Sequence, residues 1–188
     1  MSFRSRRTHP VFLTLLAAAL LLAAPPAARA FSLDQWGLAL TSGQDMDVAP
    51  GRLSRVGVIG HAAGPLWQGR HARLELRLEL HAGWFSDYHR GWESAATGGL
   101  RLRLGCACAG SFYLEAGIGP SYNSLAIAEL GTRFNFLSYA GLGVRLPWTE
   151  SLAWEIGYRV RHLSNAGLHP RNHGVTSHQF LLGVVISF

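Results

Sequence analysis

The chain has 188 residues, of which 48% are hydrophobic and only 15% are charged, and all 17 of its basic residues are arginine. This length suits one domain, or at most two small ones. Beyond the N-terminus no apolar run approaches the roughly 18 residues that a membrane-spanning helix needs, which excludes a helical membrane bundle. The formal charge of +6 would suit a nucleic-acid partner, but four of the arginines lie in the first 30 residues. Without them 13 basic residues stand against 11 acidic ones, so no nucleic-acid partner is expected.

The first 30 residues predict a cleaved signal peptide. Three arginines within positions 4–7 precede an apolar core over 11–24, and a small-x-small cleavage pattern ends at Ala30. A membrane anchor is the alternative, but the apolar run is short and two prolines end it. We therefore expect export with removal of residues 1–30, and a mature single domain over 31–188.

Two cysteines, Cys106 and Cys108, stand within one short glycine-flanked segment. A structural zinc site would need more ligands at suitable spacing. A small-loop disulfide formed in an oxidising compartment and two idle thiols are both compatible with this segment. The cysteines therefore predict no function, and no metal or cofactor is expected.

Segment 71–84 shows the dominant pattern of the mature chain, an alternation with a period of two. Its even positions are apolar from Leu74 to Trp84, and its odd positions carry alternating charge from Arg73 to His81. Successive side chains of a strand point to opposite faces, so the segment has one apolar and one charged face. A helix would scatter the charges around its circumference. The pattern therefore predicts a β-strand.

The same alternation predicts seven further strands. They are expected near 33–41, 52–60, 100–104, 112–119, 135–146, 154–161 and 179–188, the first two with weaker patterns. The total of eight is even, as is usual for the antiparallel β-barrels of bacterial outer membranes.

Two architectures fit eight amphipathic strands. A soluble sandwich or lipocalin-like barrel would turn the apolar face inward, whereas an outer-membrane barrel turns it toward lipid. Three features favour the membrane barrel. The apolar face carries Trp84, Trp154, Tyr158 and Phe188 near strand ends, the opposite face is rich in the Gly, Arg and Glu that fill a narrow lumen, and the last strand ends on the terminal phenylalanine. We predict an all-β, eight-stranded antiparallel outer-membrane barrel.

A barrel with both termini in the periplasm also predicts which connections reach the cell surface. Surface loops are expected near 43–50, 85–96, 121–132 and 163–174, and short periplasmic turns near 105–109 and 147–150. The connection over 61–70 is long for a periplasmic turn, and the pattern does not explain its length.

His162 and Ser164 continue the outward-facing row of the seventh strand. Two such side chains, two residues apart on one face, lie close enough for contact between a nucleophile and its base. They fall on the lipid-facing wall at the outer end of the strand. Placing two polar side chains there costs free energy, which favours a functional role for the pair. The plainer alternative is an interfacial pair at the point where the strand leaves the membrane.

Four stretches resemble the lipid A 3-O-deacylase family (PagL-type). They are LEAGIG at 114–119, LGTRFNF at 130–136, HLSNAG at 162–167 and NHG at 172–174. The resemblance spans roughly 112–188 and is faint before that. It implies an eight-stranded outer-membrane esterase that removes the ester-linked acyl chain at position 3 of lipid A, working from its lipid-facing surface.

By position within this resemblance, Ser164 would be the nucleophile and His162 the general base. The side-chain amide of Asn172 and the backbone N–H of Gly167 would stabilise the oxyanion, where fixed donors are worth about 2.7–4 kcal/mol each. The family places a glutamate that orients the histidine where this chain has Thr176. A threonine hydroxyl could accept an imidazole N–H, but it could not stabilise imidazolium as a carboxylate does.

The missing acid leaves more than one interpretation. The leading one is a serine–histidine ester hydrolase without a cofactor, whose substrate is lipid A in the outer leaflet. The alternative is a non-catalytic small barrel, structural or adhesive, derived from the same scaffold. Another acid could also replace the family's glutamate, with Glu129 in a surface loop more credible than Glu150 in a periplasmic turn. A homodimer is compatible with either interpretation.

Overall fold

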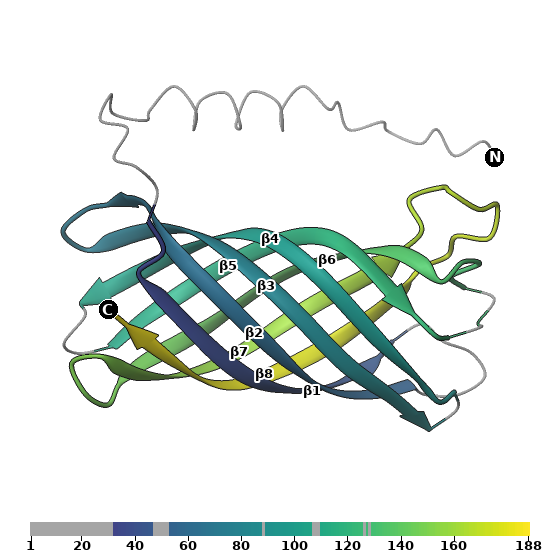
Figure 1. Cartoon of the computed structure of the whole chain (residues 1–188), viewed down its shortest axis with the longest axis horizontal. Helices are drawn as coiled ribbons and strands as arrows, with labels where there is room; N and C mark the ends of the chain where they lie inside the picture. Colours follow the sequence, from purple (N-terminus) through teal and green to yellow (C-terminus); the bar gives the residue numbers. More distant parts are fainter. Residues whose placement is uncertain (1–31, 47–52, 88, 107–109, 126, 128) are drawn as a thin grey trace, which may run out of the picture. The chain divides into compact units, whose positions relative to one another are not determined.

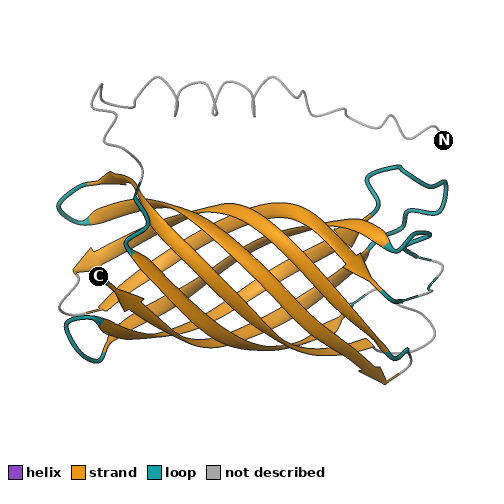
Figure 2. Ribbon diagram, in the orientation of Figure 1, coloured by secondary structure: helices purple, strands orange, loops and turns teal. Residues whose placement is uncertain are grey.

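The computed structural model describes residues 32–46, 53–87, 89–106, 110–125, 127 and 129–188, which form a closed eight-stranded antiparallel barrel (Figures 1 and 2). Each strand pairs with the next, and the last closes onto the first. The strands are β1 (Gln35–Asp45), β2 (Leu53–Gln68), β3 (Ala72–Asp87), β4 (Gly91–Cys106), β5 (Gly110–Asn123), β6 (Phe134–Pro147), β7 (Leu152–Ser164) and β8 (Val175–Ser187). No helix among the described residues is long and apolar enough to cross a membrane.

Alternation along β3 shows which face of the sheet is turned outward. The charged Glu75, Arg77 and Glu79 are buried inside the barrel, while Leu78 and Leu80 stand exposed on its outer surface. A soluble sandwich or lipocalin-like barrel would place these residues the other way round. The predicted fold, a barrel with an apolar outer wall and a charged interior, is confirmed.

Paired charges fill the middle of the lumen. Arg101 contacts the carboxylates of both Glu115, at 2.8 Å, and Glu155. Arg159 binds Glu79 at 2.7 Å and Glu115 at 2.6 Å. Breaking a buried pair leaves an uncompensated charge and is strongly destabilising, so this network fixes the relative positions of the strands that it joins.

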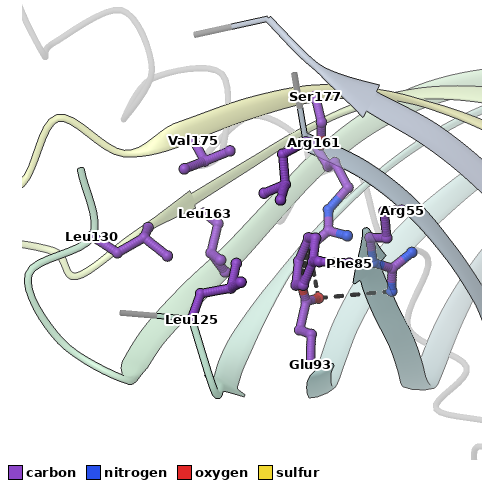
Figure 3. A pocket seen from close by; sticks show the side chains of 10 residues that line it. Arg55, Phe85, Glu93, Leu125, Leu130, Arg161, Leu163, Val175 and Ser177 are labelled. Atoms are coloured by element: carbon purple, nitrogen blue, oxygen red, sulfur yellow. Dashed lines mark hydrogen bonds and ion pairs between the residues drawn. The ribbon is translucent and has the colours of Figure 1, made fainter. Parts of the chain in front are cut away.

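An apolar cluster, which we call the outer plug, closes the lumen at the end where the β5–β6 and β7–β8 loops lie (Figure 3). Leu125, Ile127 and Leu130 of the β5–β6 loop enter it, and so do Leu163 of β7 and Val175 of β8. The full set is Leu53, Phe85, Ala95, Leu125, Ile127, Leu130, Leu137, Leu163 and Val175. The plug therefore holds the end of β7 and the start of β8 from inside the barrel.

The surface loop expected over 85–96 is much shorter than predicted. β3 continues to Asp87 and β4 already begins at Gly91. Glu93 and Thr97 face inward and are buried, but the residues between and after them are mostly alanine and glycine. Small side chains carry little hydropathy contrast, so they concealed the alternation.

The long connection over 61–70 is likewise mostly strand. β2 extends to Gln68 and pairs with β3 along most of its length, with a register shift between Pro65 and Trp67. Proline cannot donate to the ladder and is typical of bulges, so this irregularity interrupted the period of two.

The expected signal peptide and Cys108 lie outside the described residues, as does the side chain of Cys106. Cleavage after Ala30, the extent of the mature domain over 31–188 and the state of the cysteines stay predictions.

Candidate active site on the outer wall

Strands β7 and β8 bring the predicted catalytic residues together on the outer wall. His162 pairs with Thr176 across β7 and β8, and with Ser138 across β6 and β7. Ser164 follows His162 on the same face, opposite Phe136. His162, Ser164 and Thr176 are all half-buried. Leu163 and Val175, which flank them in the chain, point inward into the outer plug and hold this part of the wall.

The His162 imidazole contacts the side chain of Thr176. Its Nδ1 lies 3.0 Å from the Thr176 hydroxyl oxygen. If Nδ1 carries the proton and donates it in this hydrogen bond, Nε2 is left as the basic nitrogen. No hydrogen bond joins Ser164 to His162 among the described contacts, and such contacts are often long until substrate binds.

Gly174 lies beneath the imidazole ring. A Cβ at this position would lie 2.5 Å from Cε1 and 2.7 Å from Nε2 of His162. The glycine has a φ of 74°, and its N–H donates to the carbonyl oxygen of Glu129 at 3.0 Å. The imidazole edge that would receive a proton therefore fits against a backbone without a side chain.

Replacing Gly174 with alanine is expected to lower deacylation by at least tenfold while the barrel still assembles. The added methyl group would push the imidazole away from its position, and a misplacement of about 1 Å can cost on the order of 100-fold in rate. Fatty-acid release by purified protein measures the effect. Gly60→Ala on β2 is the control for an added methyl group, because a Cβ there meets no atom within 4 Å and the residue lies away from the site. Equal rates in the wild type and Gly174→Ala would show that the glycine does not position the ring.

A tight turn follows Ser164. The N–H of Leu168 donates to the carbonyl oxygen of Asn165 at 3.0 Å. Ala166 and Gly167, the two central residues, have φ angles of 53° and 85°, as in a type I′ turn. A positive φ at a residue other than glycine costs energy, and residues held in such conformations cluster at functional sites.

The side chain of Asn165 joins two surface loops. It is fully buried, and its Nδ2 donates to the carbonyl oxygens of Leu130, at 2.8 Å, and Arg171, at 2.7 Å. Its Oδ1 accepts the N–H of Gly167 at 2.9 Å. The backbone donor predicted for the oxyanion, the Gly167 N–H, is therefore engaged inside the turn in this structure.

The side chain of Asn172 contacts the turn that follows Ser164. Its Oδ1 accepts the backbone N–H of Asn165 at 2.9 Å, so the acceptor end of the amide is occupied. The structure gives its Nδ2 no hydrogen-bond partner among the described residues. This arrangement leaves a donor available next to the turn that follows Ser164.

Three carboxylates differ in their access to the histidine. Glu155 is buried in the lumen with Arg101. Glu150 lies in the turn between β6 and β7, at the opposite end of the barrel from the β7–β8 loop. Glu129 is half-buried in the β5–β6 loop, and its backbone carbonyl contacts Gly174.

Among the described residues no three histidine, cysteine or carboxylate side chains converge as a metal site.

Tyr158 was expected among the interfacial aromatics near strand ends, and this expectation was wrong. It lies in the middle of β7, and its hydroxyl forms a hydrogen bond with Nδ1 of His178 on β8. The sequence motifs gave His178 no role. Both residues have the outward parity of His162, which was the available signal, but their contact depends on the register of β7 against β8.

The sequence profile of the family described as "Lipid A 3-O-deacylase (PagL)" matches residues 55–185 of this chain. The chain belongs to the lipid A 3-O-deacylase family. The match covers well over half of the sequence and includes the end of β7, the following loop and the start of β8. It confirms the resemblance seen in the sequence and makes this chain an ester hydrolase and a β-barrel of the outer membrane.

Two solved structures share the fold of this deacylase. The crystal structure of the outer membrane enzyme PagL is 21% identical, with a TM-score of 0.62 over 80% of this chain and 99% of that one. The crystal structure of Neisserial surface protein A is 14% identical, with a TM-score of 0.59 over 85% of this chain and 100% of that one. No curated protein matches the sequence.

Proposed function

We propose that this lipid A 3-O-deacylase cleaves its ester with Ser164 as the nucleophile and His162 as the general base. The observation that carries the proposal is the hydrogen bond that holds His162 through Nδ1 to Thr176, beside Ser164 on the outer wall. Release of fatty acid from lipid A by the purified protein, compared with its Ser164→Ala variant, tests it.

In the first step the Ser164 oxygen attacks the ester carbonyl carbon, and its proton passes to Nε2 of His162. The tetrahedral intermediate collapses as the imidazolium returns the proton to the departing sugar hydroxyl, which leaves an acyl-enzyme. Water, deprotonated by the same nitrogen, then releases the fatty acid and restores the serine.

The oxyanion needs donors that are fixed before the reaction. The side-chain Nδ2 of Asn172 supplies the first, because Oδ1 of the same amide is held by the Asn165 N–H. The Gly167 N–H is the second, and it joins when the oxyanion replaces Oδ1 of Asn165 as its acceptor. The hydrogen bond from the Leu168 N–H to the Asn165 carbonyl oxygen holds this turn in place.

The substrate reaches the serine from the membrane rather than through the barrel. The lumen behind the site is filled by the paired charges and closed by the outer plug. Exposed Arg133 and Arg171 stand on the loops above the outer wall, and such cations suit an anionic lipid head group. The acyl chains then lie along the outer wall with the ester at its rim.

Thr176 acts as the orienting member in place of a carboxylate. Thr176→Glu is expected to raise kcat about tenfold or more, because a carboxylate would hold the ring and stabilise the imidazolium formed during proton transfer. Thr176→Val keeps the shape but removes the hydroxyl oxygen, so it should lower activity. Lipid A hydrolysis by the purified variants measures both.

The competing assignment gives the orienting role to Glu129. In that case Glu129→Gln would be damaging and both Thr176 substitutions would be nearly silent. The hydrogen bond between the Thr176 hydroxyl and Nδ1 of His162 supports Thr176 over Glu129. Indifference of the rate to both Thr176 substitutions would contradict the assignment.

Export with removal of residues 1–30 is part of this proposal, since the outer leaflet lies beyond the inner membrane. Assembly as a homodimer remains compatible with it, because the site is complete within one chain.

A further inference from the structure

Residues 129–131 of the β5–β6 loop, which we call the clamp segment, contact both ends of the β7–β8 loop. The carbonyl oxygen of Leu130 accepts from Nδ2 of Asn165, the first residue after β7, at 2.8 Å. The carbonyl oxygen of Glu129 accepts from the N–H of Gly174, the last residue before β8, at 3.0 Å. One short segment therefore fixes the loop both where it leaves β7 and where it enters β8.

Gly131 contacts the β7–β8 loop at a third point. A Cβ at this position would lie 2.4 Å from the carbonyl oxygen of Arg171 and 2.6 Å from Nδ1 of His169. The φ angle of 67° at Gly131 also favours glycine. The two loops are therefore packed backbone against backbone directly before Asn172, whose amide is proposed to stabilise the oxyanion.

The outer plug anchors the clamp segment from inside the barrel. The side chain of Leu130 is fully buried and lies in the plug with Leu125 and Ile127 of the same loop (Figure 3). Beyond the segment, the fully buried Asn135 donates through Nδ2 to the carbonyl oxygen of Thr132 at 2.9 Å. The clamp segment is thus fixed on both sides in the chain.

The contacts of the clamp segment are made with residues that adjoin the proposed catalytic groups. Gly174 packs against the imidazole of His162. Asn165 directly follows Ser164, and its Oδ1 accepts the Gly167 N–H at 2.9 Å. A misplacement of such groups by about 1 Å can cost on the order of 100-fold in rate, so the position of the clamp segment bears on turnover.

We propose that the clamp segment holds the active-site loop in its productive position, with Leu130 and Asn165 as positioning residues. Leu130 transmits the fixed position of the outer plug, and Asn165 receives it through the hydrogen bond between the two loops. The stretch LGTRFNF at 130–136 thereby gains a role. This inference rests on the proposed function, because it takes His162 and Asn172 as the groups to be positioned.

Leu130→Ala tests the inference, with Leu53→Ala as the matched control. Both leucines are buried in the outer plug, but Leu53 belongs to β2. We expect Leu130→Ala to lower kcat on lipid A about tenfold or more and to change KM less than twofold, because its side chain lies inside the barrel and the substrate outside. Leu53→Ala should keep kcat within twofold of the wild type at a similar loss of thermal stability. Leu130→Met, which nearly conserves volume, should restore most of the rate.

Asn165→Asp tests the hydrogen bond between the loops without removing any atom from the plug. The carboxylate keeps an acceptor for the Gly167 N–H, but it cannot donate to the carbonyl oxygens of Leu130 and Arg171. We expect kcat to fall about tenfold or more in a barrel that still shows heat-modifiable migration. This variant carries the test if Leu130→Ala does not assemble.

The contrary outcomes are distinct from failure of the proposed function. A wild-type kcat in assembled Leu130→Ala, or in Asn165→Asp, would overturn the positioning role. An equal fall in kcat for Leu130→Ala and Leu53→Ala would also overturn it, because the effect would then belong to the plug as a whole. Full activity of Ser164→Ala in the same assay would instead overturn the proposed function.

Discussion

Ser164→Ala is expected to abolish release of the acyl chain from lipid A while leaving a folded barrel. The hydroxyl oxygen is the atom that forms the acyl-enzyme, and no hydrogen bond of the described fold depends on it. Because the side chain stands half-buried on the outer wall, neither the lumen network nor the outer plug changes. Fatty-acid release measures activity, and heat-modifiable migration in gel electrophoresis measures folding.

His162→Ala should reduce the rate by a factor on the order of 1,000 or more, because the serine then has no base. Nucleophile and base act as a unit, so the double variant should be scarcely worse than either single one. Near-native activity in either single variant would show that the residue concerned has been assigned the wrong role.

Asn172→Ala is expected to lower kcat by about 100- to 1,000-fold, the usual effect of removing one oxyanion donor. Alanine also removes Oδ1, which accepts the Asn165 N–H at 2.9 Å, so this variant alone mixes a loop effect with a catalytic one. Asn172→Asp separates the two. It keeps an acceptor for the Asn165 N–H but replaces the donor with a negative charge where negative charge develops.

We therefore expect Asn172→Asp to be at least as damaging as Asn172→Ala in single-turnover measurements, with barrel assembly unchanged. Near-normal activity in Asn172→Asp together with a loss in Asn172→Ala would show that the residue only supports the loop. Normal activity in both variants would remove it from the site altogether.

The sequence predicted most of the barrel because lumen and lipid impose opposite demands on neighbouring residues. Along β3, Arg77 and Glu79 alternate with Leu78 and Leu80, and each side chain has the exposure that this alternation predicts. The prediction missed two stretches of strand where neighbouring residues differ little in hydropathy or the pairing is irregular. These are the alanines and glycines at the start of β4 and the part of β2 near Pro65. Leu181 and Val185 interrupted the alternation of β8, and the structure buries both inside the barrel.

Alternation also predicted that His162 and Ser164 share the outer wall, because this needs only the order of residues along one strand. Contacts between separate loops could not be predicted in this way. Asn165 reaches the carbonyl of Leu130, 35 residues away along the chain, and Gly174 contacts the carbonyl of Glu129. These contacts depend on how the β5–β6 loop folds into the outer plug. Alternation between neighbouring residues does not determine the fold of a loop.

Mass spectrometry of lipid A from cells that display this protein on their outer membrane tests the central claim most directly. Matched cells carrying Ser164→Ala at the same verified surface level are the control. We predict that the wild type converts lipid A to a form that lacks one acyl chain, the chain ester-linked at position 3, and that the variant leaves lipid A unchanged. Identical spectra from the two strains would contradict the account, and so would loss of a chain from any other position.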